Sequence, residues 1–331
     1  MQEYDYGSAI HAGFDYLLKN YPEVFVLGQG LWSPWYVGNT MTDLDKVYGA
    51  ERVIDTPVSE AACTGAAVGA SLAGMRTIVV HPRMDFMLYG LDAIVNQAAK
   101  WSHMFGGQAH PAVTIRGIIN RGGEQGAQHS QALHSWFCHV PGLRVVMPYS
   151  VADARDLFVA SVLCDDPVVF IDDRWLYSQL DELPPIVEQR LEDIGPKLIG
   201  EGEDITIVGS GYSTLLADKA GKTLKDRGCS ADIIDLRILN PIDDGLIVDS
   251  VRKTGRLLVV DGGWKNCGLG SEIVTRVMEQ IDPRGLRSKP ARIALPDAPA
   301  PSTRALEADY YPSQDTVEVA ALDCLRGLPA E

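Results

Sequence analysis

The sequence predicts an α/β protein of two successive domains, each built on a mainly parallel sheet. Short apolar runs alternate with longer stretches of helical periodicity along the chain. The 331 residues also exceed what one ordinary domain needs. A polar, proline-bearing stretch at residues 178–203 interrupts the alternation. We therefore expect a first domain at 1–185, a linker at 186–203 and a second domain at 204–331.

Six candidate strands precede the linker, with helical patterns between them. Ser150, with Asp153 three residues later, predicts a capped helix that continues through Leu163. The stretch Glu60–Gly74 is mostly Ala, Gly and Ser, so a helix there has little bulk and suits close packing against another backbone. The expected strands are Val24–Leu27, Arg52–Ile54, Thr77–Val80, Ala112–Ile115, Arg144–Met147 and Val168–Ile171.

The same alternation resumes after the linker, without an internal repeat of fixed period. The second domain is therefore expected to be a smaller α/β unit. Its expected strands are Ile205–Val208, Ala231–Asp235, Leu257–Val260 and Arg292–Ala294, and its expected helices are Thr214–Lys225, Asp243–Lys253 and Gly270–Ile281.

Composition excludes several classes of function. A formal net charge of −15 argues against nucleic acid as a main ligand, because phosphate binding needs clustered Lys and Arg. The six cysteines show no CxxC pairing, which favours buried thiols in a reducing compartment. The sequence shows no signal-peptide pattern and no apolar run of the roughly 18 residues that a membrane span needs. We expect a cytoplasmic protein without a membrane segment.

Common catalytic and metal motifs are missing. The sequence has no GxxxxGK[ST] phosphate loop and no GxSxG nucleophile elbow. Its glycine pairs after strands lack the third glycine of a dinucleotide fingerprint. His129, His134 and His139 are spaced five apart, which on a helix rotates each by roughly 140° from the last. Because such side chains do not share a face, we expect no metal held by this chain.

Several segments together resemble one family. They read TPVSEAACTGAAVGASLAGMR at Thr56–Arg76, NQAAKWSHMFGGQ at Asn96–Gln108 and GAQHSQALHSWFCHVPGLRVVMP at Gly126–Pro148. Further matches are DPVVFID, ADIIDLRILNPID, TGRLLVVDGG, GLGSEI and LPDAPAPS. In this order and spacing, the sequence resembles the β subunits of 2-oxo acid dehydrogenase E1 components of the pyruvate, branched-chain and acetoin type, which are related to transketolase.

The resemblance implies a transketolase-like pyrimidine-binding domain followed by a transketolase-type C-terminal domain. It also implies an enzyme with thiamine diphosphate as cofactor, bound between two subunits. In that family an α-type partner supplies a GDG motif that holds Mg²⁺ and the diphosphate, and this chain contains no GDG. The chain is therefore expected to be inactive alone and to work in an α₂β₂ heterotetramer.

The resemblance assigns the chemistry to Glu60 and His129. Glu60 would face N1′ of the aminopyrimidine and share a proton with it, which prepares the cofactor to attack a carbonyl. The structural alternative is a carboxylate stabilised by a helix N-terminus. His129 in AQHSQ would hydrogen-bond or protonate the substrate. Phe86 would pack on the aminopyrimidine and Val58 would line its pocket, although core packing remains an alternative for both.

Two stretches depart from the family pattern. Gln29–Gly30 stands where the family often carries Glu-Asp. The segment Val80–Met84 contains Pro82 and two potentially cationic residues, His81 and Arg83, which we take as candidate substrate contacts. The alternative is a loop whose charges point to water.

The departures leave the substrate and the acceptor open. The first hypothesis is decarboxylation of a 2-oxo acid and transfer of the acyl unit, with a lipoyl acyltransferase as a candidate partner. The second is transketolase-like two-carbon transfer or carboligation onto an aldehyde or sugar. The third, a non-catalytic interaction subunit, is disfavoured because both Glu60 and His129 are present.

Overall fold

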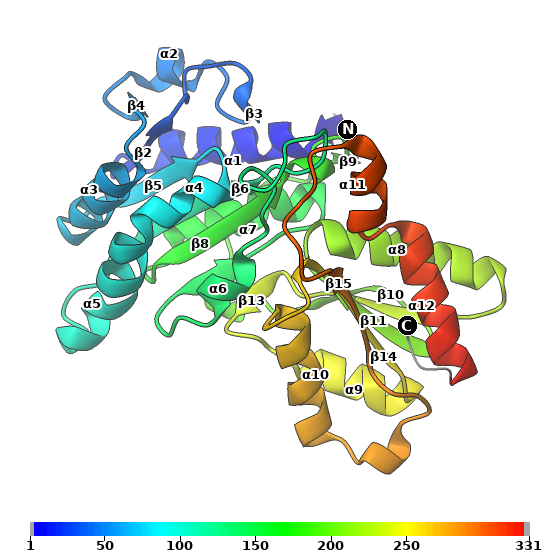
Figure 1. The fold of residues 1–331 in the computed structure, drawn as a ribbon. Helices are drawn as coiled ribbons and strands as arrows, with labels where there is room; N and C mark the ends of the chain where they lie inside the picture. The colour runs from blue at the N-terminus through cyan, green and yellow to red at the C-terminus, as the bar shows by residue number, and fades with distance from the viewer. Residues whose placement is uncertain (1–2, 328–331) are drawn as a thin grey trace. The chain divides into compact units, whose positions relative to one another are not determined.

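The computed structural model describes residues 3–327, which form two compact α/β units (Figure 1). Unit 1 contains the described residues up to Asn120 and Trp136–Ile194. Unit 2 contains Arg121–Ser135 and the described residues from Gly195 onward. The α/β prediction is confirmed. The main division falls inside the expected linker of residues 186–203, while the segment Arg121–Ser135 folds with unit 2 rather than with its neighbours in sequence.

Unit 1 is a doubly wound parallel sheet with strand order β7-β8-β6-β5-β2-β4. All six predicted strands occur, because their apolar runs are buried on the sheet. The sheet strands are β2 (Val24–Gln29), β4 (Val53–Thr56), β5 (Arg76–His81), β6 (Val113–Ile119), β7 (Arg144–Val146) and β8 (Val168–Asp173). The short strands β1 (Glu3–Asp5) and β9 (Leu180–Glu182) pair antiparallel, and β3 covers Tyr36–Asn39.

The helices of unit 1 cover this sheet. The predicted cap is present, because the Ser150 hydroxyl accepts a hydrogen bond from the Asp153 backbone N–H at 3.1 Å. Helices α1 and α7 pack together, where the rings of Phe14 and Phe158 lie 4.5 Å apart. The helices are α1 (Tyr6–Asn20), α2 (Leu44–Tyr48), α3 (Glu60–Leu72), α4 (Met84–Met87), α5 (Ala99–Met104), α6 (His134–Cys138) and α7 (Val151–Leu163), with single turns at Leu88–Gly90, Arg174–Leu176 and Leu191–Asp193 and a π-helical segment at Asp92–Ala98.

One charged network lies inside the sheet of unit 1. Arg116, on β6, is fully buried and donates to both carboxylate oxygens of Asp172 on β8 at 2.8 Å. It also donates to the hydroxyls of Thr40 and Tyr177, at 2.9 and 3.0 Å. Every side of the guanidinium is thus hydrogen-bonded, which offsets the cost of removing its charge from water.

Unit 2 is a five-stranded sheet of order β10-β12-β11-β14-β15 in which only β10 runs antiparallel. Its core is aliphatic, with Ile205, Ile207 and Leu258 at its centre. Helices α8 and α12 pack against one another. The five strands are β10 (Lys197–Gly200), β11 (Ile205–Gly209), β12 (Ala231–Asp235), β14 (Leu257–Trp264) and β15 (Ala291–Leu295), and the short strand β13 (Ile238–Asn240) is not part of this sheet. The helices are α8 (Tyr212–Asp226), α9 (Gly245–Thr254), α10 (Leu269–Gln280), α11 (Arg304–Tyr310) and α12 (Gln314–Arg326), with one turn at Pro283–Gly285. Across the described residues, every helix is too short or too polar to cross a membrane.

Candidate active site

A small cavity opens in unit 1 at the carboxyl ends of β2, β4 and β5. It encloses about 230 Å³ of empty space, part of it open to solvent. In open parallel sheets this edge is where ligands bind. Gly28 is required in its floor, because a Cβ there would lie 2.5 Å from the Val80 carbonyl oxygen. The cavity is lined by Gly28, Gln29, Thr56, Pro57, Ser59, Glu60, Cys63, Val79, Val80, His81 and Pro82.

Glu60 is the acidic side chain of this cavity. It is the first residue of α3, follows the N-cap Ser59 and is half-buried. Its backbone carbonyl accepts a hydrogen bond from the Thr64 hydroxyl at 2.7 Å. The half-buried position of Glu60 keeps its carboxyl oxygens within reach of a ligand in the cavity. The cavity therefore offers one carboxyl group among uncharged polar side chains and apolar atoms of Val79, Val80 and two prolines.

His81 lies on the same cavity, but it is not a free cation. The imidazole is almost fully buried, and its Nε2 lies 3.2 Å from the Thr64 hydroxyl. Since that hydroxyl donates to Glu60, Nε2 carries the proton and donates to Thr64. Burial lowers the pKa of His81 to about 4, so the ring is neutral near pH 7. Its role here is to hold the first turn of α3 beside Glu60.

The other predicted contacts in unit 1 lie off the cavity wall. Among the described residues, Val58, Phe86 and Arg83 are not part of the lining. Val58 is 69% exposed on the turn before Glu60, and Phe86 is half-buried in α4. Burial lowers the pKa of Arg83, whose Nη1 donates to the Asn120 carbonyl oxygen at 3.5 Å. Their proposed roles remain predictions.

His129 belongs to the segment Arg121–Ser135 of unit 2. It is half-buried, and its backbone N–H donates to the Gly126 carbonyl oxygen at 3.4 Å. The segment has no helix or strand before His134. Hydrogen bonds to β14 and to α11 hold it, rather than a backbone ladder.

The three histidines that are spaced five residues apart lie in different environments. His134 is buried and its Nε2 lies 2.8 Å from Oδ1 of Asp261, whereas His139 is exposed. The sequence does not indicate this pair, because its two residues are separated by 127 positions. The sequence contains no signal that would have joined them.

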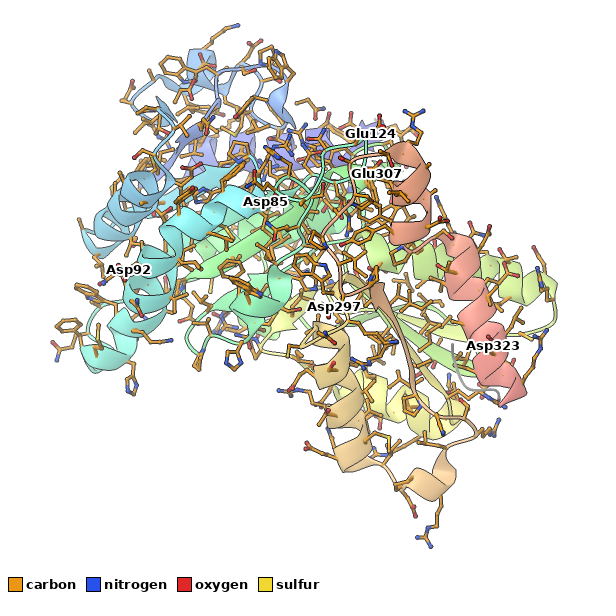
Figure 2. All side chains as sticks on the ribbon, in the orientation of Figure 1. Asp85, Asp92, Glu124, Asp297, Glu307 and Asp323 are labelled. Atoms are coloured by element: carbon orange, nitrogen blue, oxygen red, sulfur yellow. The ribbon has the colours of Figure 1, made fainter. Side chains whose placement is uncertain are left out.

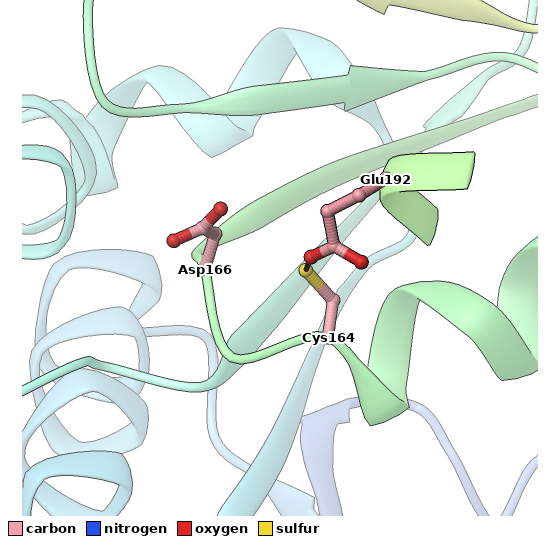
Figure 3. Close-up of side chains that lie close together, drawn as sticks. All are labelled: Cys164, Asp166 and Glu192. Atoms are coloured by element: carbon pink, nitrogen blue, oxygen red, sulfur yellow. Dashed lines mark hydrogen bonds between the residues drawn. The ribbon is translucent and has the colours of Figure 1, made fainter. Parts of the chain in front are cut away.

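A different group of possible metal ligands occurs among the described residues. Cys164, Asp166 and Glu192 bring one ligand atom each within 4.8 Å of one another (Figure 3). The Arg144 Nε donates to Asp166 at 2.8 Å, and its Nη2 lies 3.7 Å from Glu192. Burial raises the pKa of the Cys164 thiol to about 12. A guanidinium thus already balances these acids, and the thiol is protonated, so we assign no metal here.

Models of two protein families match this architecture. The pyrimidine-binding domain of transketolase matches residues 2–179, and the C-terminal domain of transketolase matches residues 197–317. The chain is thus a two-domain protein of the transketolase type. A solved structure described as a split-gene transketolase in an inactive β₄ tetramer has the same fold, with a TM-score of 0.79 and 21% identity over 98% of this chain and 99% of that one.

Several proteins of known function are similar to this chain, and all of them are β subunits of enzymes. Subunit β-1 of the mitochondrial pyruvate dehydrogenase E1 component from Arabidopsis thaliana is 37% identical, over 96% of this chain and 88% of its own length. The β subunit of acetoin:2,6-dichlorophenolindophenol oxidoreductase from Cupriavidus necator is 34% identical over 96% of each chain. The pyruvate dehydrogenase E1 β subunit of Rhizobium meliloti is 38% identical over 78% of this chain and 56% of its own length.

The chain belongs to the β-subunit family of thiamine-diphosphate-dependent 2-oxo acid dehydrogenase E1 and acetoin dehydrogenase enzymes.

Proposed function

We propose that this chain is the β half of an α₂β₂ enzyme that decarboxylates a 2-oxo acid and transfers the resulting acyl unit. The observation that carries the proposal is Glu60 at the cavity on the carboxyl edge of the sheet. When bound, thiamine diphosphate supplies a nucleophilic carbon and accepts electrons from the cleaved bond. Glu60 would hold and exchange the proton at N1′ of its aminopyrimidine, and Val79 and Val80 would contribute apolar atoms to the wall of the cavity.

His129 acts on the substrate in this proposal. A histidine can donate to or accept from a carboxylate or carbonyl oxygen near neutral pH, which suits binding and proton transfer. His81 is buried and neutral, so it positions α3 and does not bind an anionic substrate as a cation. The altered segment around His81 thus gives little support to the alternative of transfer onto a sugar.

The cavity offers only half of a cofactor site. It contains one carboxylate, and the single group of potential metal ligands found in residues 3–327 lies elsewhere, at Cys164. Mg²⁺ on a diphosphate needs protein oxygen ligands besides water. Together with the missing GDG motif, this supports an α subunit that supplies the magnesium and diphosphate contacts.

The surface of α3 supports the need for a partner. Its exposed face carries only small residues, and a Cβ built on Gly65 or Gly69 would meet no atom within 4 Å. Val58, on the turn before this helix, is also exposed. The helix therefore offers the close backbone approach expected from its composition, but to another chain. The exposed small residues of α3 are Ala61, Ala62, Gly65, Ala66 and Gly69.

Calorimetry tests the assembly. The purified chain alone is expected to bind thiamine diphosphate with Mg²⁺ weakly, and the chain co-expressed with its α-type partner is expected to bind it tightly. The complex should convert 2-oxo acids with a dye as electron acceptor. Tight magnesium-dependent binding by the chain alone would contradict the half-site. Turnover that requires an aldehyde acceptor would favour carboligation instead.

The His129→Ala variant tests the assignment of roles. It is expected to lose substrate turnover while the hydrogen–deuterium exchange rate at C2 of the bound cofactor stays close to wild type. His139→Ala, an exposed histidine ten residues later, is the matched control and should behave as wild type. Equal loss of turnover and of C2 exchange in His129→Ala would show that His129 holds the cofactor or the fold.

A further inference from the structure

The segment Arg121–Ser135 is irregular yet ordered by contacts within unit 2. Its backbone adopts positive φ at four positions, one of them the non-glycine Glu124. A structureless segment of this length inside a compact protein is usually functional. Without a hydrogen-bonded ladder of its own, its conformation depends on side chains that reach it from elsewhere in unit 2. The positive-φ residues are Gly122, Gly123, Glu124 and Gly126.

Unit 2 contacts the start and the middle of this segment. At the start, Nη1 of Arg121 donates to the Gly262 carbonyl oxygen on β14 at 2.8 Å. In the middle, the Glu124 N–H donates to Oε1 of Glu307 on α11 at 2.8 Å, and Figure 2 shows these two side chains together. The carboxylate of Glu124 in turn accepts from the Arg304 N–H at 3.1 Å, at the N-terminus of α11.

The end of the segment is held by a buried acid–histidine pair. Nε2 of His134 lies 2.8 Å from Oδ1 of Asp261 on β14, and both side chains are at most 4% exposed. Asp261 also accepts from the N–H groups of Gly263 and Gly270, at 2.9 and 3.3 Å. Burial acts to raise the pKa of Asp261, but His134 and these two donors hold it below its usual value. Asp261 is thus a buried carboxylate enclosed by the His134 ring and two backbone N–H donors.

Among residues 3–327, Asp261 is the side chain that hydrogen-bonds the His134 imidazole. Nδ1 of His134 is buried and has no hydrogen-bond partner in the described part of the chain. A Cβ on Gly263 would lie 3.1 Å from Cε1 of the same ring, so the strand packs directly against it. Removal of Asp261 would leave both nitrogens of this buried ring without a hydrogen-bond partner, and removal of His134 would take one of the three donors from the buried carboxylate; both losses are costly.

We propose that His134 and Asp261 are positioning residues for His129. They fix the end of the segment five residues after His129, while Glu307 fixes its middle five residues before it. In this arrangement the C-terminal unit determines where His129 is presented. The proposal rests on the role of His129 in the proposed function, and it gives the C-terminal unit a part in the reaction that needs no substrate contact.

A pair of substitutions at His134 separates positioning from packing. His134→Leu fills the space without a donor, and His134→Gln keeps a donor near the position of Nε2. In the full-length chain, His134→Leu is expected to raise amide hydrogen exchange across residues 121–135 by about tenfold or more. His134→Gln should stay within a fewfold of wild type. Unchanged exchange in His134→Leu would overturn the proposal.

A control variant loosens unit 2 at a different place. Asp232 is also buried, and it accepts from Lys253 and Ser250 at 2.8 and 2.6 Å. Asp232→Asn should lower the stability of the unit without a selective rise in exchange at residues 121–135. If His134→Leu fails to fold, Glu307→Ala gives the second route, because it releases only the middle of the segment.

Activity of the complex with the α-type chain completes the test. His134→Leu should lower kcat with C2 exchange near wild type, as His129→Ala does, and the double variant should lose no more than His129→Ala. His134→Gln should restore most of kcat. If His129→Ala itself retains activity, the proposed function fails. If His129→Ala is impaired and His134→Leu is not, the positioning role fails alone.

Discussion

Glu60 and His129, the two residues assigned to the chemistry, are supported in different ways. Glu60 begins a regular helix, and the nearby Thr64 and His81 side chains complete its support within unit 1. His129 lies in an irregular segment whose contacts come from residues more than 100 positions away. The acid is therefore placed by a regular helix, whereas the segment that carries the histidine is held by hydrogen bonds to residues distant in sequence.

Because of this difference, we expect Glu60 and His129 to respond differently to substitutions elsewhere in the chain. Substitutions far from Glu60 should leave its carboxylate in place as long as unit 1 folds. Substitutions in β14 or α11 should displace His129 even though they lie far from it in sequence. Three predictions test whether the two supports are independent.

The largest effect is expected at Glu60. Glu60→Gln keeps the size of the side chain but cannot exchange the N1′ proton, so C2 exchange in the complex should fall by on the order of 10²–10⁴-fold. Unfolding by urea should be close to wild type. Glu279→Gln, on the exposed surface of α10, is the control. C2 exchange at the wild-type rate in Glu60→Gln would exclude the carboxyl from proton transfer.

The second prediction concerns the buried ion pair between Arg116 and Asp172 in the sheet of unit 1. Asp172→Asn leaves the fully buried Arg116 without its counter-charge, which should lower the free energy of unfolding of unit 1 by about 3–5 kcal/mol. Urea denaturation measures it. Asp249→Asn removes an exposed ion pair with Arg252 and should cost below about 1 kcal/mol.

Hydrogen exchange on the Asp172→Asn variant tests whether the segment Arg121–Ser135 is held independently of unit 1. Below the unfolding transition, Asp172→Asn should leave protection of residues 121–135 unchanged, because that segment is held within unit 2. A rise in exchange in that segment would show that its order depends on the stability of unit 1. Glu60 and His129 would then not be supported independently.

The smallest expected effect is the loss of folding stability at low pH that His81 causes. The folded pKa of about 4 lies below the ordinary value of 6.5, so the unfolded chain binds the proton more tightly. The contribution of His81 to stability is therefore complete above pH 6.5 and is lost as the pH falls from 6.5 toward 4. Between about pH 7.5 and about pH 5, wild type should lose roughly 2 kcal/mol more than His81→Leu.

Urea titrations of both proteins at the two pH values measure this difference, and other acid-sensitive groups cancel between them. Equal losses would mean that His81 is not neutral in the fold. His110→Leu, in which a half-exposed histidine is replaced, is the control and should follow wild type.

Local sequence determined most of the secondary structure. Short apolar runs predicted ten strands, and all ten occur as parallel strands of the two sheets, since a strand buried on both faces of a parallel sheet is continuously apolar. Two four-residue strands, β3 and β10, were not predicted. Ser150 predicted the start of α7 because a hydroxyl at the N-cap satisfies a free N–H group. Glu60 was identified with its helix, and the motif around it indicated the family that the comparisons then showed.

Only the tertiary structure decided which charges the fold neutralises and what holds His129. From the sequence, His81 was a potentially cationic substrate contact. In the structure, burial beside Thr64 keeps its ring neutral. The segment Arg121–Ser135 reads as part of the first domain, yet its hydrogen bonds join it to unit 2. Hydrogen bonds and desolvation act between groups that are close in space, and a pair such as His134 and Asp261 leaves no trace in local sequence pattern.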